Sequence, residues 1–328
     1  MASSLVNKAR IVRSRLRNFV RIFLNYFYDL NRFWKSSGLS GEWGEENLYA
    51  RITMDYHRIE KGLALRNPRL GFGSDVIERL LSMVPHYEGR YGAALPTKAA
   101  RVALQEYMEF HSAKDMRFPK LEGFLSGRSL EVDELDTAGT LMVKREAIHR
   151  QSGIDFLGFA NSRFSVRQFS GERVAVESIE CAILAALKSP SVCNRQTARV
   201  HFFQAAELVE KILGFQNGNR GFGEQAGGLL VVTSDMRGFV SVGERNQCWI
   251  DGGIFSMSLV YALHALGIGS CMLNWSAEYP RDKALRRAAN IPDSEAVIMM
   301  IAVGHMLDEF SVARSPRRAV SDVLRSYV

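Results

Sequence analysis

The apolar residues of this chain follow two different patterns, and the change falls near Arg163. Before that point they recur at steps of three and four, which is the spacing of an amphipathic helix. After it, helical stretches alternate with short apolar runs of a length typical of buried strands. A chain of 328 residues with 47% apolar content can bury more than one core. The sequence therefore predicts a helical first half and an α+β second half, with one sheet covered by helices.

This pattern divides the chain into three predicted units, residues 1–37, 38–160 and 161–328. The first holds one basic amphipathic helix over 8–35. The second is helical, with helices predicted at 45–64, 75–86, 97–115 and 131–151. The third is predicted to hold helices at 176–188, 205–213, 253–266 and 281–289 and strands at 200–203, 229–233, 270–274 and 296–303.

The first helix carries an aromatic-rich apolar side and several arginines on another face. The apolar positions are Val12, Leu16, Phe19, Phe23, Phe27, Leu30 and Trp34, and the basic ones include Arg10, Arg13, Arg17 and Arg21. Two interpretations stay open. The apolar side either packs on the rest of the protein or on a second subunit, or it lies on an anionic membrane surface.

The formal charge of +7 is confined to the first 37 residues, which hold eight bases and one acid, while the remaining 34 bases and 34 acids cancel. The second and third units therefore have no net attraction for nucleic acid. Four cysteines without CxxC pairs argue against a disulfide framework or a zinc site and suit a reducing cytoplasm. The basic amino terminus lacks the apolar core and cleavage site of a secretory signal, so we expect a cytoplasmic protein, with peripheral membrane contact through 8–35 as the alternative.

Residues 252–277 contain no Asp, Glu, Lys or Arg, which makes them long enough to consider as a membrane span. Gly267 and Gly269 interrupt the stretch. We therefore predict a buried helix, a turn and a strand.

Ionisable and turn residues are concentrated at 55–62 and 67–73. The favoured interpretation is a salt-bridged helix end capped at Gly62. The alternative is that His57, Arg58, Glu60 and Lys61 line a pocket.

Arg163, Ser165 and Arg167 alternate along a predicted extended segment, so their side chains should point to one side. Two guanidinium groups beside a hydroxyl suit a flavin nucleotide, since arginine matches phosphate oxygens and a cation stabilises the charge of a reduced flavin. About one helix later follows a polar loop with Pro190, Ser191, Asn194 and Gln196.

An Arg-x-Ser-x-Arg segment, a helix, a Pro-Ser-x-x-Asn-x-Gln loop and a strand, in this order, resemble the FMN-dependent nitroreductase family. The resemblance implies a three-layer FMN domain over 161–328. It places Arg163, Ser165 and Arg167 on one side of the cofactor, and the Pro190 to Gln196 loop against the flavin of a partner subunit.

Two further pieces of the resemblance lie downstream. The uncharged helix and the strand after it are similar to the family's central elements, which implies that Leu273 and Asn274 lie near the flavin ring. Arg314 and Arg317 occupy the place of the family's phosphate contacts, and Asn219 is a candidate for the pyrimidine edge. The sequence departs from the family pattern at Phe164 and in lacking a clear lysine near Arg317. Residues 57–73 resemble an extension of longer family members.

The resemblance implies an oxidoreductase that passes hydride from NAD(P)H through FMN to a small-molecule acceptor, and it implies a homodimer. No separate acid or base is required, so no catalytic residue is assigned. The chain has no strand-linked Gly-x-Gly-x-x-Gly motif, which a nicotinamide that only visits a flavin does not need. The alternative is a nitroreductase-like protein, with or without flavin, that has a non-redox or scaffolding role at a membrane surface.

Overall fold

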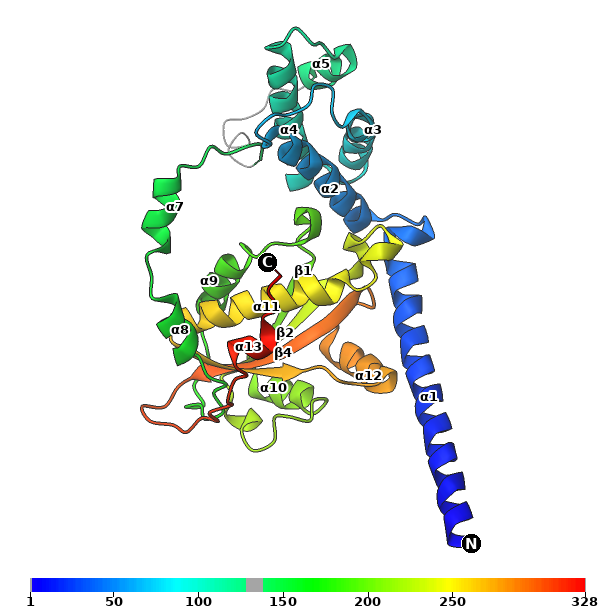
Figure 1. Cartoon of the computed structure of the whole chain (residues 1–328), viewed down its shortest axis with the longest axis vertical. Helices are drawn as coiled ribbons and strands as arrows, with labels where there is room; N and C mark the ends of the chain where they lie inside the picture. The colour runs from blue at the N-terminus through cyan, green and yellow to red at the C-terminus, as the bar shows by residue number, and fades with distance from the viewer. Residues whose placement is uncertain (1, 128–137, 328) are drawn as a thin grey trace.

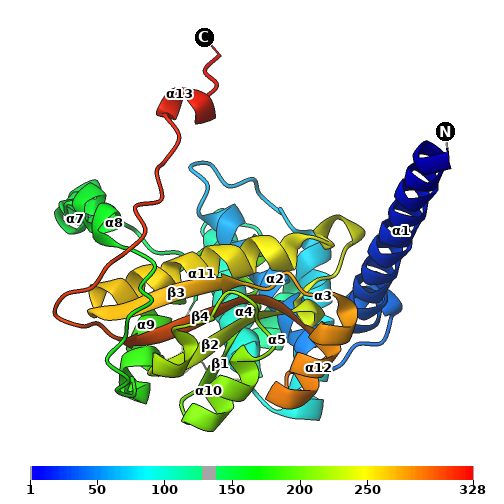
Figure 2. The ribbon, with the colours of Figure 1, turned by 90° about the horizontal axis from the view of Figure 1, so that it is seen from below.

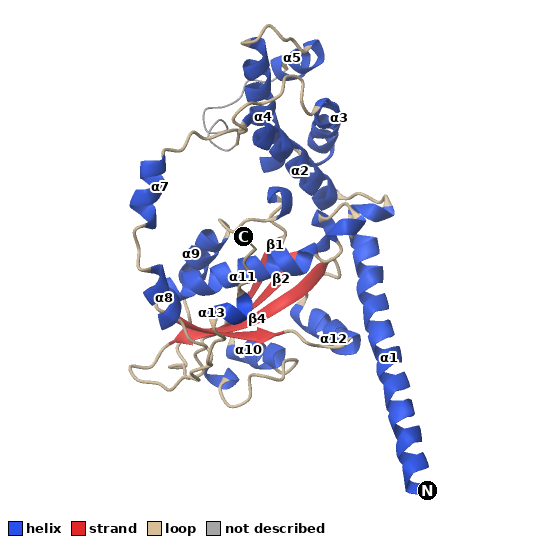
Figure 3. Cartoon of the chain, viewed as in Figure 1, coloured by secondary structure: helices blue, strands red, loops and turns tan. Residues whose placement is uncertain are grey.

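The computed structural model of the chain describes residues 2–127 and 138–327. It shows a long helix at one edge, a bundle of helices, and a sheet flanked by helices (Figures 1 and 3). The first half contains α1 (Ala2–Ser36), α2 (Glu45–Leu63), α3 (Ser74–Tyr91), α4 (Leu95–Ser112), α5 (Pro119–Ser126) and α7 (Arg145–Ser152). The second half contains α8 (Phe156–Ser162), α9 (Val176–Ala186), β1 (Ala198–Phe203), α10 (Ala206–Leu213), β2 (Gly228–Asp235), α11 (Gln247–Ala265), β3 (Ile268–Asn274), α12 (Tyr279–Ala289), β4 (Glu295–His305) and α13 (Val320–Val323).

The sheet is antiparallel throughout, with strand order β1-β2-β4-β3. The two central strands are the most buried, and every residue of β2 is buried. This burial explains why short apolar runs located all four strands in the sequence, since a strand covered on both faces reads as a continuous apolar run. The predicted α+β class is confirmed.

Helices cover both faces of the sheet, which gives three layers (Figure 2). Successive residues of a strand point to opposite faces. Leu229 and Val231 of β2 therefore pack with α10 and α12, while Leu230 and Val232 pack with α9 and α11. Phe255 and Leu259 bring α11 against its face of the sheet.

The helical bundle has its own core, formed mainly by α2, α3 and α4. Its largest side chains are Tyr87 and Tyr107, both 2% exposed or less. Gly62 does not cap α2, because the helix continues to Leu63. The ring of Phe72 packs directly on Gly62, where a Cβ would lie 2.0 Å from a ring carbon. The predicted cap is therefore wrong, and this glycine serves close packing instead.

The predicted salt bridges of this helix end are confirmed. Asp55 is fully buried, and Arg79 donates to both of its carboxylate oxygens at 3.0 Å. His57 contacts Glu60 at 2.9 Å. Ion pairs thus account for this concentration of charged residues.

The helix predicted at 131–151 is wrong at 138–144 and confirmed at 145–151. Residues 131–137 lie outside the described residues, and the chain at 138–144 has no helix. Within the described residues, α7 matches the carboxy-terminal end of the prediction. The short helices α5 and α8 were not predicted, because one or two turns carry too little periodicity to be recognised.

The long helix α1 runs along one side of the molecule in both Figures 1 and 2. Polar residues make most of its contacts with the rest of the chain, as when the Tyr28 hydroxyl donates to Asp282 at 2.8 Å, and Phe33 is buried against Phe239 near the end of the helix. Phe19, Phe23 and Phe27 remain more than half exposed. The interpretation that this aromatic side packs on the rest of its own chain is therefore wrong. None of the helices in the described ranges is long and apolar enough to cross a membrane.

Candidate functional site

Strand β3 forms one edge of the sheet, and residues 163–167 run beside it. Ser165 forms a parallel bridge with Ser270, and the Val166 amide donates to the Ser270 carbonyl at 3.0 Å. The Val166 side chain is buried in the core and fixes the register. Because side chains alternate along an extended segment, Arg163 and Arg167 are expected on the same side as Ser165. The structure thus shows extended pairing at Ser165, and the common side of the three side chains stays a prediction.

Arg163 lies near the carboxy-terminal end of α11. Ser162 Oγ and His264 Nε2 are 2.8 Å apart, which ties this segment to the helix. Burial lowers the pKa of His264, and the nearby Arg163 charge lowers it further. His264 is therefore held neutral near physiological pH, so it adds no second positive charge beside Arg163.

Leu273, Asn274 and Asn219 meet at the other end of β3. The Gln216 amide donates to the Asn274 carbonyl at 3.2 Å, and the Asn219 amide donates to the Leu213 and Gln216 carbonyls at 2.8 and 2.7 Å. Leu273 is buried, whereas the Asn274 side chain is exposed. The structure thus brings these three residues together at one corner of the sheet. The side-chain amide of Asn219 is already occupied by the carbonyls of its own turn.

Arg314 and Arg317 are exposed and lie after β4 in a segment without helix or strand. Arg317 donates to the carbonyl of Ser315 in the same segment. No contact in the described part of the chain joins either arginine to Arg163. The structure therefore does not bring this predicted pair to the β3 edge.

The loop with Pro190, Ser191, Asn194 and Gln196 is held in an uncommon conformation. Cys193, Asn194 and Gln196 have φ values of 49°, 55° and 49°. Non-glycine residues with positive φ are strained and concentrate at functional sites. The Gln196 amide nitrogen donates to Ser191 Oγ at 3.0 Å, and Pro190 is exposed beside them.

Buried charged groups anchor this loop to the rest of the α+β half. Arg195, whose side chain is fully buried, contacts Glu244 at 3.2 Å through Nη1. Burial opposes ionisation of Glu244, but the hydrogen bonds from Arg195 and Val240 outweigh it and lower the pKa of Glu244. The Val192 amide donates to Asp251 near the start of α11 at 3.1 Å. No local pattern in the sequence indicates that Arg195 and Glu244 pair, because 49 positions separate them.

The two predicted groups lie at opposite ends of α11. The loop is bonded to Asp251 and the Arg163 segment to His264, which corresponds to about 20 Å of helix. Within the described residues no hydrogen bond or ion pair joins the two groups. One copy of the chain therefore does not place both groups around a single small ligand.

The helical bundle meets the loop in a cavity of about 320 Å³. Its lining includes Asn194 and Gln196 from the loop, and Glu46, Tyr49 and Tyr56 from α2. Burial is the main cause that raises the pKa of Tyr56, and a hydrogen bond with Asn194 opposes it. The helical half is thus part of the surroundings of the loop.

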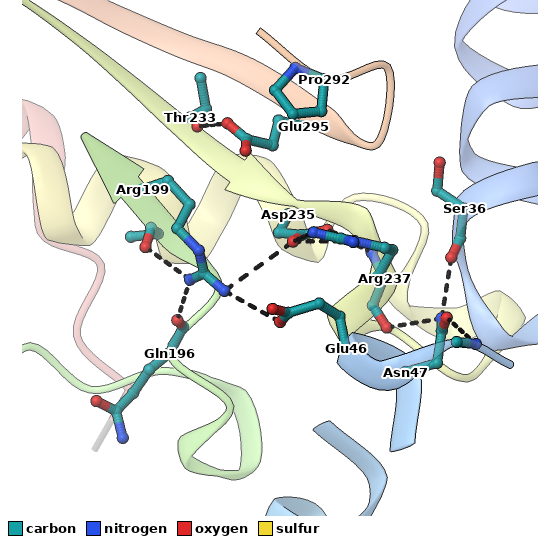
Figure 4. Close-up of polar contacts among 12 residues, drawn as sticks. Ser36, Glu46, Asn47, Gln196, Arg199, Thr233, Asp235, Arg237, Pro292 and Glu295 are labelled. Atoms are coloured by element: carbon teal, nitrogen blue, oxygen red, sulfur yellow. Dashed lines mark hydrogen bonds and ion pairs between the residues drawn. The ribbon is translucent and has the colours of Figure 1, made fainter. Parts of the chain in front are cut away.

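Arg199 is the central residue of this contact (Figure 4). It donates to the Gln196 carbonyl at 3.0 Å and to Glu46 at 3.3 Å, and it lies 4.0 Å from Asp235. Asn47 adds a second bridge, since its amide donates to the carbonyls of Ser36 and Arg237 at 3.0 Å. Sequence reasoning missed these residues, because partners 153 positions apart leave no local pattern.

The described residues contain no cluster of three or more His, Cys, Asp and Glu that could hold a metal ion. All four cysteines are free thiols. The chemistry of the candidate site therefore depends on arginines, hydroxyls and amides.

Residues 210–305 match the family model of the nitroreductase family. A relative from Archaeoglobus fulgidus, provisionally named NADH dehydrogenase/NAD(P)H nitroreductase, is 28% identical over 154 residues, covering 45% of this chain and 83% of the relative. An FMN-dependent nitroreductase structure from Clostridium difficile R20291 is 25% identical, covering 51% of this chain and 93% of that one with a TM-score of 0.42. A provisionally named nitroreductase in complex with FMN from Desulfovibrio desulfuricans is 20% identical, covering 54% and 99% with a TM-score of 0.46.

The family match spans the second half of α10 and all of β2, α11, β3, α12 and β4. It includes Asn219, Leu273 and Asn274, and it leaves the Arg163 segment, the Pro190 loop and Arg314 outside. The matched elements are those that form three strands of the sheet and the helix joining the two groups. Residues 210–305, within the α+β half of this chain, are therefore similar to the nitroreductase family.

Proposed function

We propose that this protein is an FMN-dependent oxidoreductase that passes hydride from NADH or NADPH to a small organic acceptor. The observation that carries the proposal is that residues 210–305 match the nitroreductase family and that Ser165, from the preceding Arg163 segment, bridges Ser270 on the edge strand β3. The name of the archaeal relative refers to both nicotinamide reductants, which supports this choice of donor. The free cysteines support a cytoplasmic location.

The residues of the β3 edge fit a flavin nucleotide. Neither Arg163 nor Arg167 forms an ion pair with a carboxylate in the described part of the chain, so both guanidinium groups are available to an anion. Arginine binds phosphate through two parallel hydrogen bonds. FMN, when bound, would supply the hydride-transfer chemistry. The two arginines would hold its negative charge, Ser165 would donate a hydrogen bond, and Leu273 with Asn274 would orient the ring.

A second copy of the chain would complete the site. The Pro190 to Gln196 loop is about 20 Å of helix away from Arg163, so only a partner's loop could reach the same flavin. The helix α11 offers the surface for such a contact, because Trp249, Ile250 and Ile254 on it are exposed and its one carboxylate, Asp251, is buried. A two-fold axis perpendicular to this helix would pair like surfaces in antiparallel directions and bring the loop of one copy toward the Arg163 segment of the other. We therefore propose a homodimer.

The three-unit division gives each part a role in this proposal. Residues 161–328 hold the flavin, 38–160 form a wall beside the loop, and 1–37 determine where the protein resides. The exposed face of α1 favours one alternative, a nitroreductase-like scaffold at a membrane surface without redox activity.

Reduction of the bound flavin tests the proposal. Under anaerobic conditions, NADH or NADPH added to the purified protein should bleach the visible flavin absorbance, and an acceptor such as a quinone or nitroarene should restore it. Protein that binds flavin but is not bleached by either nicotinamide would contradict the oxidoreductase proposal and favour the scaffold.

A further inference from the structure

The helix α1 is attached to the rest of the chain by a polar stripe. Asn25 accepts a hydrogen bond from the Tyr279 amide at 2.7 Å, Tyr28 donates to Asp282 at 2.8 Å, and Arg32 donates to the Asp293 carbonyl at 3.0 Å. Arg21 forms an ion pair with Glu278. These positions recur at steps of three and four, so they share one side of the helix. That side fixes the orientation of α1 about its own axis.

The side opposite this stripe is apolar and exposed. Its residues, called the aromatic stripe here, are Val12, Leu16, Phe19, Phe23, Phe27, Leu30 and Trp34, and each is between 53% and 68% exposed. The pattern repeats every eleven residues, or about 3.67 per turn, so it runs nearly straight along the helix. In both Figures 1 and 2 the rest of the molecule lies to one side of α1. The aromatic stripe therefore faces an open side that a flat surface could approach.

Basic residues border the aromatic stripe on both sides. At 100° per residue, Arg13 falls on one flank and Arg15 on the other, while Arg17 and Arg10 lie farther round, toward the polar stripe. All four are exposed, and none of them forms an ion pair with a carboxylate in the described ranges. The first 37 residues carry the whole net charge of +7. A partner for this face should therefore combine an apolar interior with negative charge at its surface.

A second copy of α1 meets only half of this requirement. It would match the apolar stripe, but it would bring two strongly basic helices side by side, and like charges at an interface weaken association. An anionic lipid surface meets both halves, since rings settle at the level of the head groups while arginines extend toward lipid phosphates.

We propose that α1 lies flat on an anionic membrane surface, with the aromatic stripe in the interface and the arginine flanks on lipid phosphates. The polar stripe then holds the α+β half on the aqueous side of the helix. This proposal does not depend on flavin binding, because none of the residues involved belongs to the β3 edge or the Pro190 loop.

Co-sedimentation of the full chain with vesicles tests the proposal. We expect binding to phosphatidylcholine vesicles that contain phosphatidylglycerol, at least tenfold weaker binding to phosphatidylcholine alone, and release by high salt. The double substitution Phe19→Ser with Phe23→Ser should abolish binding. Arg13→Gln with Arg17→Gln should weaken it by about 30-fold, at roughly one kilocalorie per mole for each charge.

A matched control replaces Leu184 and Leu208, which are exposed leucines on α9 and α10, by serine and should leave vesicle binding unchanged. Circular dichroism should show unchanged folding in every variant, because the altered side chains are exposed. Absence of binding to anionic vesicles would overturn the proposal. So would a fall in oligomeric state caused by the phenylalanine substitutions without vesicle binding, which would identify the stripe as a contact between copies.

Discussion

Helices α1 and α11 both leave large apolar side chains exposed, but they differ in charge. The aromatic stripe of α1 is bordered by arginines, whereas α11 has one carboxylate, Asp251, and that group is buried. An uncharged apolar surface can meet its own copy without repulsion. A basic one favours a surface of opposite charge. The comparison suggests that the flanking charges decide which partner each helix takes.

The two helices also differ in what holds them to the chain. Phe255, Leu259 and Leu263 of α11 are buried in the core beside the sheet. The attachment of α1 is mostly polar and centres on Asp282, which accepts hydrogen bonds from Tyr28, Trp275 and Arg286 at 2.8, 2.8 and 2.6 Å. The placement of α1 should therefore be sensitive to single polar substitutions.

Asp282→Ala is expected to have the largest effect. It removes the common partner of Tyr28 and Arg286 and leaves buried cations without their carboxylate, which costs about 3–5 kcal/mol. Urea unfolding should show this loss, and limited proteolysis should cut α1 faster. The matched control, Tyr28→Phe, removes one hydrogen bond and should cost about 1 kcal/mol. Equal stability of the two variants would contradict the central place given to Asp282.

The second largest effect is expected for Ile250→Arg, which tests whether α11 forms the contact between two copies. A two-fold axis would bring the new charge into the proposed interface twice, so the dimer dissociation constant should rise by about 100-fold or more. Sedimentation velocity measures this change, and flavin content should fall with it because each site would lose the partner's loop. Leu208→Arg on α10 is the control and should leave the dimer intact. If the Ile250→Arg variant remains a dimer, the proposed location of the interface on α11 is contradicted.

Arg163→Ala and Arg167→Ala test the β3 edge. Hydrogen bonds to charged groups contribute about 1.5–3 kcal/mol, so each substitution should raise the dissociation constant for FMN by roughly 10-fold to 100-fold. Fluorescence quenching of added FMN measures this. Arg173→Ala, an exposed arginine on the same connection, should have no effect. An unchanged FMN affinity in both test variants would show that neither arginine binds FMN.

The smallest effect concerns Glu244, which anchors the loop near the start of α11. Its pKa is lowered in the folded chain from the ordinary value of 4.5, so its stabilising contribution is fully present above that pH and is lost as the pH falls through the lowered value. The Glu244→Gln variant should therefore lose less stability than the unmodified chain when the pH falls below about 4.5. The urea midpoint measured between pH 3 and 6 checks this. A pH profile identical to that of the unmodified chain would contradict it.

The sequence predicted the sheet well because burial leaves a local pattern. The apolar runs of β2 and β4 are read directly, and the alternation of Arg163 and Ser165 follows once the segment is extended. It failed where the pattern was weak, as at 138–144, and where a glycine had a packing role, as at Gly62.

The relation between the two halves could not be predicted. The contact of Glu46 with Arg199 and the support of the loop by Arg195 depend on residues far apart in the chain. The sequence also located the amphipathic helix but not its orientation, since only the structure shows that Asn25, Tyr28 and Arg32 face the protein. Periodicity identifies the faces of a helix, while tertiary contacts decide which face is buried.

The most direct test of the central claim is the visible absorbance spectrum of the purified chain, combined with chromatography of the cofactor released by heat. We predict a flavin spectrum with about one FMN per chain in a dimer. A colourless protein that also fails to bind added FMN would contradict the proposed oxidoreductase.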